Sequence, residues 1–262
     1  MTATTQLIQL LLFLLGLGVS VSTVMDVQKR VIGGQRCGRQ YHVKLRGVAS
    51  GSQNLCGGSL ISNRWILTAA HCLKPGRTMF AELSVDPGSP AREVQITAEP
   101  VIYMDKDDNN NSRLHDIMLL QLPSPTGIKP IGLPDCGHRP KMVQIAGHAA
   151  TTGGPNNERK PGRSPDLHCA DIEVVDCEDL KKTLQTNFQQ VYQVKDCQHW
   201  FCGQTPGMDI CYGDSGGGVV HGDEIYGVIS FLGDPDKVCT TASAFMDLCN
   251  PEYIDWIRKT IT

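Results

Sequence analysis

The sequence has few aromatic residues and no excess of charge of either sign. Of its 262 residues, 6% are aromatic and 19% are charged, and 24 Lys and Arg face 27 Asp and Glu, for a net charge of −3. Without a basic stripe, nucleic-acid binding has no electrostatic support. With 40% hydrophobic residues and 27 Gly, the composition also disfavours a disordered chain, a coiled coil and a collagen-like repeat. The length allows one large or two small domains.

Motifs for metals and nucleotides are also missing. The chain contains no C-x-x-C pair, and its 8 His lack the H-x3–5-H spacing of zinc fingers. Its glycine clusters, Gly153-Gly154 and Gly216-Gly217-Gly218, do not open a helix after a strand, as a Walker or dinucleotide-binding loop requires. We therefore expect no metal and no cofactor.

Only one stretch is strongly hydrophobic, and it lies near the N-terminus. Leu7 to Val19 is almost unbroken in apolar residues and is followed by the small Ser20 and Ser22, which is typical of a signal peptide over residues 1–22. The alternative is a buried N-terminal helix. No later segment is long and apolar enough for a membrane span, so we expect a secreted, extracellular protein without a membrane segment. The 11 cysteines fit an oxidising compartment, and their odd number leaves at least one unpaired.

Beyond the signal, the pattern is that of short strands separated by Gly, Pro and Asn turns. Helical periodicity is confined to Cys177–Asn187 and to the C-terminal end around Trp256. The proline-rich stretch Leu122–Pro134 cannot be a central strand and predicts a connector between two all-β halves. The β-like runs are Ser59–Thr68, Arg92–Ala98, Ile117–Leu122, Met142–Ala146, Gly218–His221 and Ile225–Phe231.

Three separated residues carry chemistry. His71 follows an apolar, β-branched run, Asp116 begins a buried strand, and Ser215 lies between glycines that expose its Oγ and let the backbone turn sharply. Each alone has an ordinary structural explanation, as a core histidine, a turn former or a loop serine. Together, in the order His, Asp, Ser, they match the order of an acyl-transfer triad.

The segments around these residues resemble the chymotrypsin/trypsin family of secreted serine proteases, from Val31 to Thr262. The resemblance rests on RVIGG, LCGGSLISNRWILTAAHC, HDIMLLQL and CYGDSGGG. It implies an all-β fold of two six-stranded antiparallel Greek-key β-barrels, with the active site between them and a C-terminal α-helix. The expected limits are about 31–130 for the N-terminal barrel, about 131–250 for the C-terminal barrel and 251–262 for the helix.

By the same resemblance, His71 is the general base, Asp116 orients it and Ser215 is the nucleophile. The N–H groups of Gly213 and Ser215 then form the oxyanion hole. The protein is expected to be a secreted serine endopeptidase, a trypsin-like hydrolase acting on protein or peptide substrates. The family further implies a monomer and serine protease inhibitors as partners.

The resemblance also implies a zymogen. Cleavage after Arg30 by an activating protease would remove a propeptide over residues 23–30 and free the amine of Val31. In the family this amine pairs with the aspartate before the nucleophile, here Asp214, and the buried ion pair completes the oxyanion hole.

The bridges of the family can be placed on ten of the cysteines and leave Cys197 over. Cys197 is then either a free thiol or the site of an intermolecular disulfide. The implied pairs are Cys37–Cys169, Cys56–Cys72, Cys136–Cys249, Cys177–Cys202 and Cys211–Cys239.

The primary substrate pocket combines a favourable charge with a constriction. Asp209 stands where the family selects Arg or Lys, and Ser230 and Phe231 are expected in the pocket wall. Leu232 replaces a glycine at the entrance, and an insertion falls within Gly233–Val238. Three alternatives remain: cleavage after Arg or Lys, a protease of non-basic specificity with Asp209 paired internally, or a protease-derived binding protein with an obstructed pocket.

A glycosylation sequon, Asn110-Asn111-Ser112, precedes Asp116 in a polar stretch. We expect Asn110 to be exposed and available for an N-linked glycan.

Overall fold

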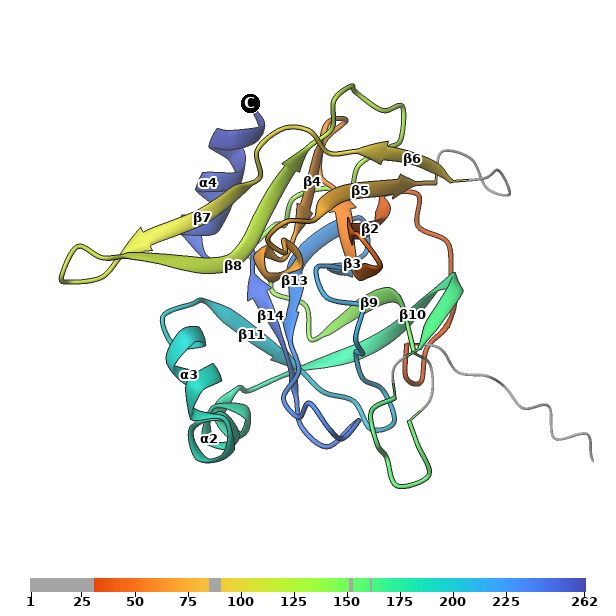
Figure 1. Cartoon of the computed structure of the whole chain (residues 1–262). Coiled ribbons are helices and arrows are strands. Elements are labelled where there is room, and N and C mark those ends of the chain that lie inside the picture. The colour runs from red at the N-terminus through yellow and green to blue at the C-terminus, as the bar shows by residue number, and fades with distance from the viewer. Residues whose placement is uncertain (1–30, 85–90, 151–152, 161) are drawn as a thin grey trace, which may run out of the picture.

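The computed structural model describes residues 31–84, 91–150, 153–160 and 162–262 (Figure 1). The predicted signal peptide, 1–22, and propeptide, 23–30 with Arg30, lie outside the described residues. Within the described ranges, no helix is long and apolar enough to cross a membrane.

The N-terminal half folds into one antiparallel sheet with the order β6-β5-β2-β3-β4-β8-β7. The strands at its two ends, β6 and β7, come from one stretch of chain that is interrupted at 96–100. Pro100 in this interruption lacks an N–H donor, which breaks the strand. One part then pairs with β5 and the other with β8, so this segment closes the sheet as a sixth barrel strand would. The strands are β2 (His42–Ala49), β3 (Ser52–Leu60), β4 (Trp65–Thr68), β5 (Thr78–Leu83), β6 (Arg92–Gln95), β7 (Val101–Lys106) and β8 (Ser112–Gln121).

The C-terminal half forms a second antiparallel sheet, with the order β1-β10-β11-β14-β13-β12-β9. An additional pairing of β10 with β9 closes the six strands from β9 to β14 into a ring. The seventh strand, β1, comes from the N-terminal end of the described chain and pairs with β10. The strands are β1 (Gln35–Arg36), β9 (Met142–Ala149), β10 (Arg163–Val175), β11 (Trp200–Gly203), β12 (Gly218–His221), β13 (Glu224–Phe231) and β14 (Ser243–Asp247).

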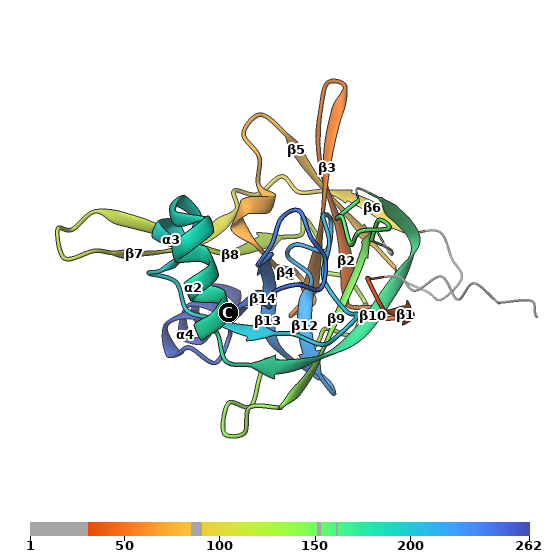
Figure 2. The same ribbon diagram turned by 90° about the horizontal axis from the view of Figure 1, so that it is seen from below.

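Within the described ranges, four helices accompany the sheets: the 3₁₀ helix η1 (Ala70–Cys72), α2 (Glu178–Asn187), α3 (Gln189–Lys195) and α4 (Pro251–Ile261). α4 is capped at its N-terminus by Asn250, whose side chain accepts a hydrogen bond from the Glu252 N–H, and it has proline in its first turn. Its Tyr253 and Ile257 are fully buried in the core of the N-terminal sheet, so the end of the chain packs across both halves. Figures 1 and 2 both show α2 and α3 on the side from which the β7–β8 hairpin extends.

The predicted fold class is confirmed: two antiparallel barrel-like sheets and a C-terminal helix. The connector Leu122–Pro134 is free of named strands, and the helix predicted over Cys177–Asn187 is α2. One expectation was wrong in detail, because the run Ser59–Thr68 contains a turn between β3 and β4. The short strand β1, which falls within the expected limits of the first barrel, pairs with β10 of the second sheet.

Four of the five expected disulfides are present: Cys37–Cys169, Cys56–Cys72, Cys136–Cys249 and Cys177–Cys202. The fifth expectation is corrected, because Cys211 and Cys239 are free thiols, as is Cys197. Cys211 and Cys239 pack in the same small cluster, but the Cys211 Sγ is directed at the Lys160 carbonyl oxygen, 3.6 Å away. The Cys239 N–H donates to a buried Asp209 carboxylate instead, which holds its backbone at φ 59°.

The contact between α4 and the N-terminal sheet predicts a core substitution with a large effect. Replacing Ile257, 0% exposed, by Ala removes packing that cannot fully relax, and we expect the free energy of unfolding to fall by about 2–5 kcal/mol. Urea unfolding measures the change. Lys259→Ala on the exposed face of the same helix is the control and should stay within about 0.5 kcal/mol of the parent. An equal effect of the two substitutions would show that α4 does not pack on this core.

Candidate active site

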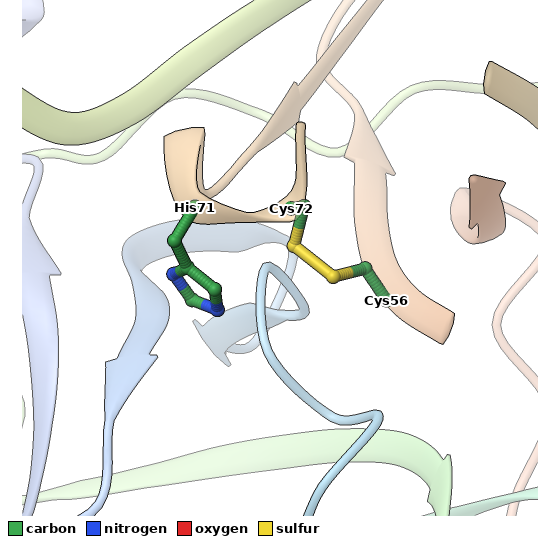
Figure 3. Close-up of side chains that lie close together, drawn as sticks. All are labelled: Cys56, His71 and Cys72. Atoms are coloured by element: carbon green, nitrogen blue, oxygen red, sulfur yellow. A yellow bond between two sulfur atoms is a disulfide. The ribbon is translucent and has the colours of Figure 1, made fainter. Parts of the chain in front are cut away.

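His71 is positioned by a turn that follows a buried strand. β4 leads into η1, and the Thr68 Oγ1 at the end of β4 donates to the Gly57 carbonyl oxygen at 2.8 Å. The next residue after His71, Cys72, is bonded to Cys56 of β3. Figure 3 shows the imidazole projecting from η1 beside this disulfide. The histidine is thus fixed at its backbone while about a third of its side chain, 36%, is open to solvent.

Asp116 lies in β8 and is almost fully buried, with 4% of its side chain exposed. His71 Nδ1 is 2.9 Å from its Oδ2 and 3.0 Å from its Oδ1, and the His71 N–H donates to Oδ1 at 2.8 Å. Ser230 Oγ of β13 also donates to Oδ2. Strands of both sheets and η1 therefore meet at one carboxylate.

Ser215 lies in the turn between β11 and β12, and its backbone is tied to the other half of the molecule. The Gly57 N–H donates to the Ser215 carbonyl oxygen at 2.7 Å, and Cys72 Sγ lies 3.7 Å from that oxygen. The turn requires glycine where φ is positive, +112° at Gly213 and +81° at Gly216. Among the described residues, no protein acceptor is found for the N–H groups of Gly213 and Ser215, and both residues line the cleft that opens over this turn.

A cleft of about 780 Å³ opens over this region and is lined by His71, Gly213 and Ser215. Three of the four residues predicted for the primary pocket, Ser230, Phe231 and Leu232, also line it, whereas Asp209 does not.

His71 also has its ring nitrogen within 4.8 Å of the sulfur atoms of Cys56 and Cys72. These sulfurs form a disulfide and so are not thiolate ligands, and this group does not suit a metal ion.

Comparison with known proteins places this architecture. The model of the Trypsin family matches residues 31–257. The chain belongs to the Trypsin family. Human kallikrein-8 is 30% identical over 263 residues, covering 95% of this chain and 94% of the relative, and anionic trypsin of the dog, Canis lupus familiaris, is 30% identical, covering 96% and 97%. The predicted trypsin-like serine endopeptidase is thereby confirmed, and its substrates are proteins.

Solved structures agree. Neuropsin, a serine protease expressed in the limbic system of mouse brain, is 26% identical and superposes with a TM-score of 0.65 over 87% of this chain and 99% of its own. The scabies mite inactivated protease paralogue S-D1 has a TM-score of 0.68 over 88% of this chain and 97% of its own; at 21% identity, this likeness concerns the fold alone.

This trypsin-family chain adds a cation to the buried carboxylate. Lys195, the last residue of α3, places its Nζ 2.8 Å from Asp116 Oδ2 and 3.2 Å from Ser230 Oγ, with 13% of its side chain exposed. Gln198 Oε1 accepts from the Asp116 N–H at 3.1 Å. The sequence reasoning missed both residues. The periodicity that identified α2 ends before α3, and no local motif marks Lys195.

The partners of Asp116 decide its ionisation. Burial alone would raise the pKa of this carboxyl, but the hydrogen bond from His71 and the charge of Lys195 outweigh it and hold the pKa well below its usual range. Asp116 is therefore an anion at neutral pH.

Asp209, predicted to receive the substrate's cation, is already paired. Arg159 Nη2 lies 2.7 Å from Asp209 Oδ2, and only 1% of the Arg159 side chain and 4% of the Asp209 side chain are exposed. No sequence pattern marks Arg159, because it lies in a loop without periodicity. This pair removes the free charge on which the predicted preference for Arg and Lys rests.

Asp214 is fully buried with a different set of partners. Its Oδ1 accepts from the Ala149 N–H at 3.0 Å and its Oδ2 from the Cys211 N–H at 2.9 Å. Among the described residues no cation forms an ion pair with it. Burial raises its pKa to about 7 against the opposing effect of the two N–H donors.

Val31 and Asn110 also take defined places. Val31 is 1% exposed and packs in the core of the C-terminal sheet. The adjoining Ile32 belongs to the small hydrophobic cluster that includes Ala149 and Cys211, the two residues whose N–H groups donate to Asp214. Asn110 is exposed at the tip of the β7–β8 hairpin, at φ 65°, where its Oδ1 accepts from Lys106 Nζ at 2.7 Å.

The ion pair between Lys195 and Asp116 predicts a pH-dependent stability. Lys195→Met removes one partner of a carboxylate that keeps His71 and Ser230, and we expect the free energy of unfolding at pH 7 to fall by about 1–3 kcal/mol. The depressed pKa of Asp116 makes this contribution complete above about pH 4, and it is lost as the pH falls further. Urea unfolding at pH 7 and pH 3 should therefore show a difference between wild type and variant that narrows in acid. The control is Lys182→Met on the exposed face of α2; a pH-independent loss at Lys195 would contradict the pairing.

Proposed function

We propose that this protein is secreted as a zymogen and hydrolyses peptide bonds with Ser215 as nucleophile, His71 as general base and Asp116 as the group that orients the imidazole. The observation that carries the proposal is the hydrogen bond of His71 Nδ1 to a buried carboxylate, next to a serine in a glycine-rich turn of the same cleft.

The proposed chemistry follows the acyl-transfer template. Ser215 Oγ attacks the carbonyl carbon of the scissile bond, and its proton passes to His71 Nε2. The C–N bond of the tetrahedral intermediate then breaks as His71 returns the proton to the leaving amine. Water repeats the two steps on the acyl-enzyme, releasing the second product and restoring the serine.

Two groups stabilise the charges that develop in this sequence. The N–H groups of Gly213 and Ser215, two residues that line the cleft, would donate to the oxyanion. The Asp116 carboxylate would face the imidazolium formed at His71. Because the Asp116 carboxylate also forms an ion pair with Lys195, it would stabilise the His71 imidazolium less than an aspartate without a second cation would.

The zymogen part of the proposal rests on Asp214. Among the described residues of the uncut chain, Asp214 has only N–H donors, and its raised pKa reflects a buried carboxyl without a cation there. Cleavage of Arg30–Val31 would supply the Val31 amine as the missing cation. The burial of Val31, and the place of Ile32 in one cluster with the residues whose N–H groups donate to Asp214, support this role.

The finer predictions on partners belong to the same proposal. Secretion rests on the leader over residues 1–22, an activating protease on the Lys29-Arg30 pair, and N-glycosylation on the exposure of Asn110. Serine protease inhibitors as partners and the monomeric state follow from the family likeness. Cleavage after Arg or Lys is not included, because Arg159 occupies Asp209.

The nucleophile is tested by Ser215→Ala. Loss of a triad member typically lowers kcat by about 10⁴–10⁶-fold, and a fluorophosphonate should label the cut wild type but not the variant. The control is Ser62→Ala, away from the cleft. If the cut wild type resisted labelling while folded, the alternative of a protease-derived binding protein would replace this proposal.

The activation bond is tested by Arg30→Gln. We expect a secreted, uncut and nearly inactive chain, and activity in such a preparation would contradict the zymogen model.

The raised pKa of Asp214 adds a pH test to that of the activation bond. The protonated carboxyl of Asp214 is tolerated in the folded state below about pH 4. As the pH rises to about 7, ionisation of this buried group lowers the free energy of unfolding by about 4 kcal/mol. In cut protein the amine should cancel this loss, so the difference in unfolding free energy between cut wild type and Arg30→Gln should grow from pH 5 to pH 7.5. Asp214→Asn in the uncut chain is the control and should lack this pH dependence.

A further inference from the structure

The guanidinium of Arg159 is held in a cage built largely by the inserted loop. Its Nη2 donates to the carbonyl oxygens of Lys237 at 2.8 Å and Asp234 at 3.0 Å, its Nε to Asp234 at 3.2 Å, and its Nη1 to the Ile210 carbonyl oxygen. The Arg159 N–H donates to the Asp236 carbonyl oxygen at 2.8 Å. The loop Gly233–Val238, which sequence analysis identified as an insertion, therefore fixes this cation in place.

The carboxylate of Asp209 is fully used as well. Oδ1 accepts from the Ile210 N–H at 2.8 Å and from Ser243 Oγ at 2.9 Å, and Oδ2 accepts from the Cys239 N–H at 2.9 Å and from Arg159 at 2.7 Å. Four donors occupy the four lone-pair directions of the group. A substrate cation would have to displace Arg159 from its carbonyl cage and leave that guanidinium buried without its counter-charge.

The described part of the cleft lining beside Ser215 contains no negatively charged side chain that could bind a substrate cation. Among the described residues that line this cleft, none is Asp or Glu, and its charged side chains are the exposed cations Lys74 and Arg163. An Arg or Lys side chain entering the cleft would meet like charge and no partner.

The wall of the cleft is apolar. Ile210, Phe231 and Leu232 line it beside Ser215. The segment of α2 and α3 adds Leu184, Phe188 and Val191, which extend the same surface. Phe231 packs edge-on against Trp200, with ring centroids 5.3 Å apart, so this wall is anchored in the cluster beneath α2.

We propose that Arg159 is the specificity-determining residue of this protease: by neutralising Asp209 from within, it makes the primary pocket select an apolar side chain, Leu, Met or Phe, before the scissile bond. This inference rests on the proposed peptidase activity. The binding free energy of such a side chain comes from the apolar area it buries against Phe231 and Leu232.

The first experiment compares two substrates on the cut wild type. We expect kcat/KM for a Leu thiobenzyl ester to exceed that for the matching Arg ester by about 10²-fold or more, because the guanidinium finds no counter-charge. Benzamidine, an aryl amidinium probe, should not inhibit Leu ester hydrolysis. A preference for the Arg ester, or competitive inhibition by benzamidine, would overturn the proposal.

The second experiment removes the internal cation. Met is close to Arg in length and keeps its packing, so Arg159→Met should leave the Asp209 carboxylate without its internal cation. The ratio of Arg to Leu ester turnover should then shift by about 10–10²-fold toward Arg, and benzamidine inhibition should appear. Lys160→Met, which removes the adjoining exposed cation, is the matched control and should leave the ratio unchanged. An unchanged ratio in folded Arg159→Met would also overturn the proposal.

A double variant keeps the test decisive if Arg159→Met does not fold. Arg159→Met/Asp209→Asn removes both charges, and the wild-type ratio should persist within about 3-fold because substrates never contact Asp209. A fall in Arg ester turnover relative to Leu ester would show that Asp209 binds substrate and would overturn the proposal.

Fluorophosphonate labelling in parallel separates failure of the specificity inference from failure of the proposed peptidase activity. Labelled protein that prefers Arg esters refutes the specificity alone. Folded protein that is unlabelled and hydrolyses neither ester refutes the peptidase proposal and this inference with it.

Discussion

The carboxylate of Asp116 is the point at which the separate parts of this fold meet. It receives His71 from η1 at the end of β4, Ser230 from β13 of the other sheet, and Lys195 from α3. A carboxylate buried to this degree without partners would take up a proton or destabilise the fold. The packing of the two sheets and the seating of the helical segment thus depend on one ionised group. In the proposed reaction the imidazolium of His71 would share this anion with the Lys195 ammonium.

Among the described residues, three buried carboxylates are compensated in three different ways. Asp116 has an ammonium and an imidazole, Asp209 has the guanidinium of Arg159, and Asp214 has only backbone N–H groups. The first two are complete within the described chain. Asp214 is the one whose pKa is raised to about 7, which marks it as the group still lacking a cation. The free-energy cost of burying a carboxylate is therefore offset by permanent ion pairs at Asp116 and Asp209. At Asp214 it leaves a site where a new cation could act as a switch.

The sequence predicted what local motifs encode and missed what distant loops supply. His71 and Ser215 are singled out by short motifs, and the all-β class follows from turns and alternation. The four disulfides that the structure contains are implied by the family resemblance. Arg159 and Lys195 could not be predicted, because a cation in a loop or at a helix end has no sequence pattern that names its distant carboxylate. The alternatives for Asp209 stayed open for the same reason: local sequence places a carboxylate but does not show which group neutralises it, here Arg159.

The pairing of β1 with the second sheet limits how far the new N-terminus could travel after cleavage. Cys37 is bonded to Cys169 of β10, and Gln35 and Arg36 pair with that strand. Only the few residues from Val31 to Cys37 separate the proposed amine from this anchor, a span of at most about 20 Å even when fully extended. The amine would therefore search a small volume around Asp214 and act as a tethered ligand at high effective concentration. Activation would then depend little on ions from the solvent, since the cation is the chain's own N-terminal amine, tethered a few residues from Cys37.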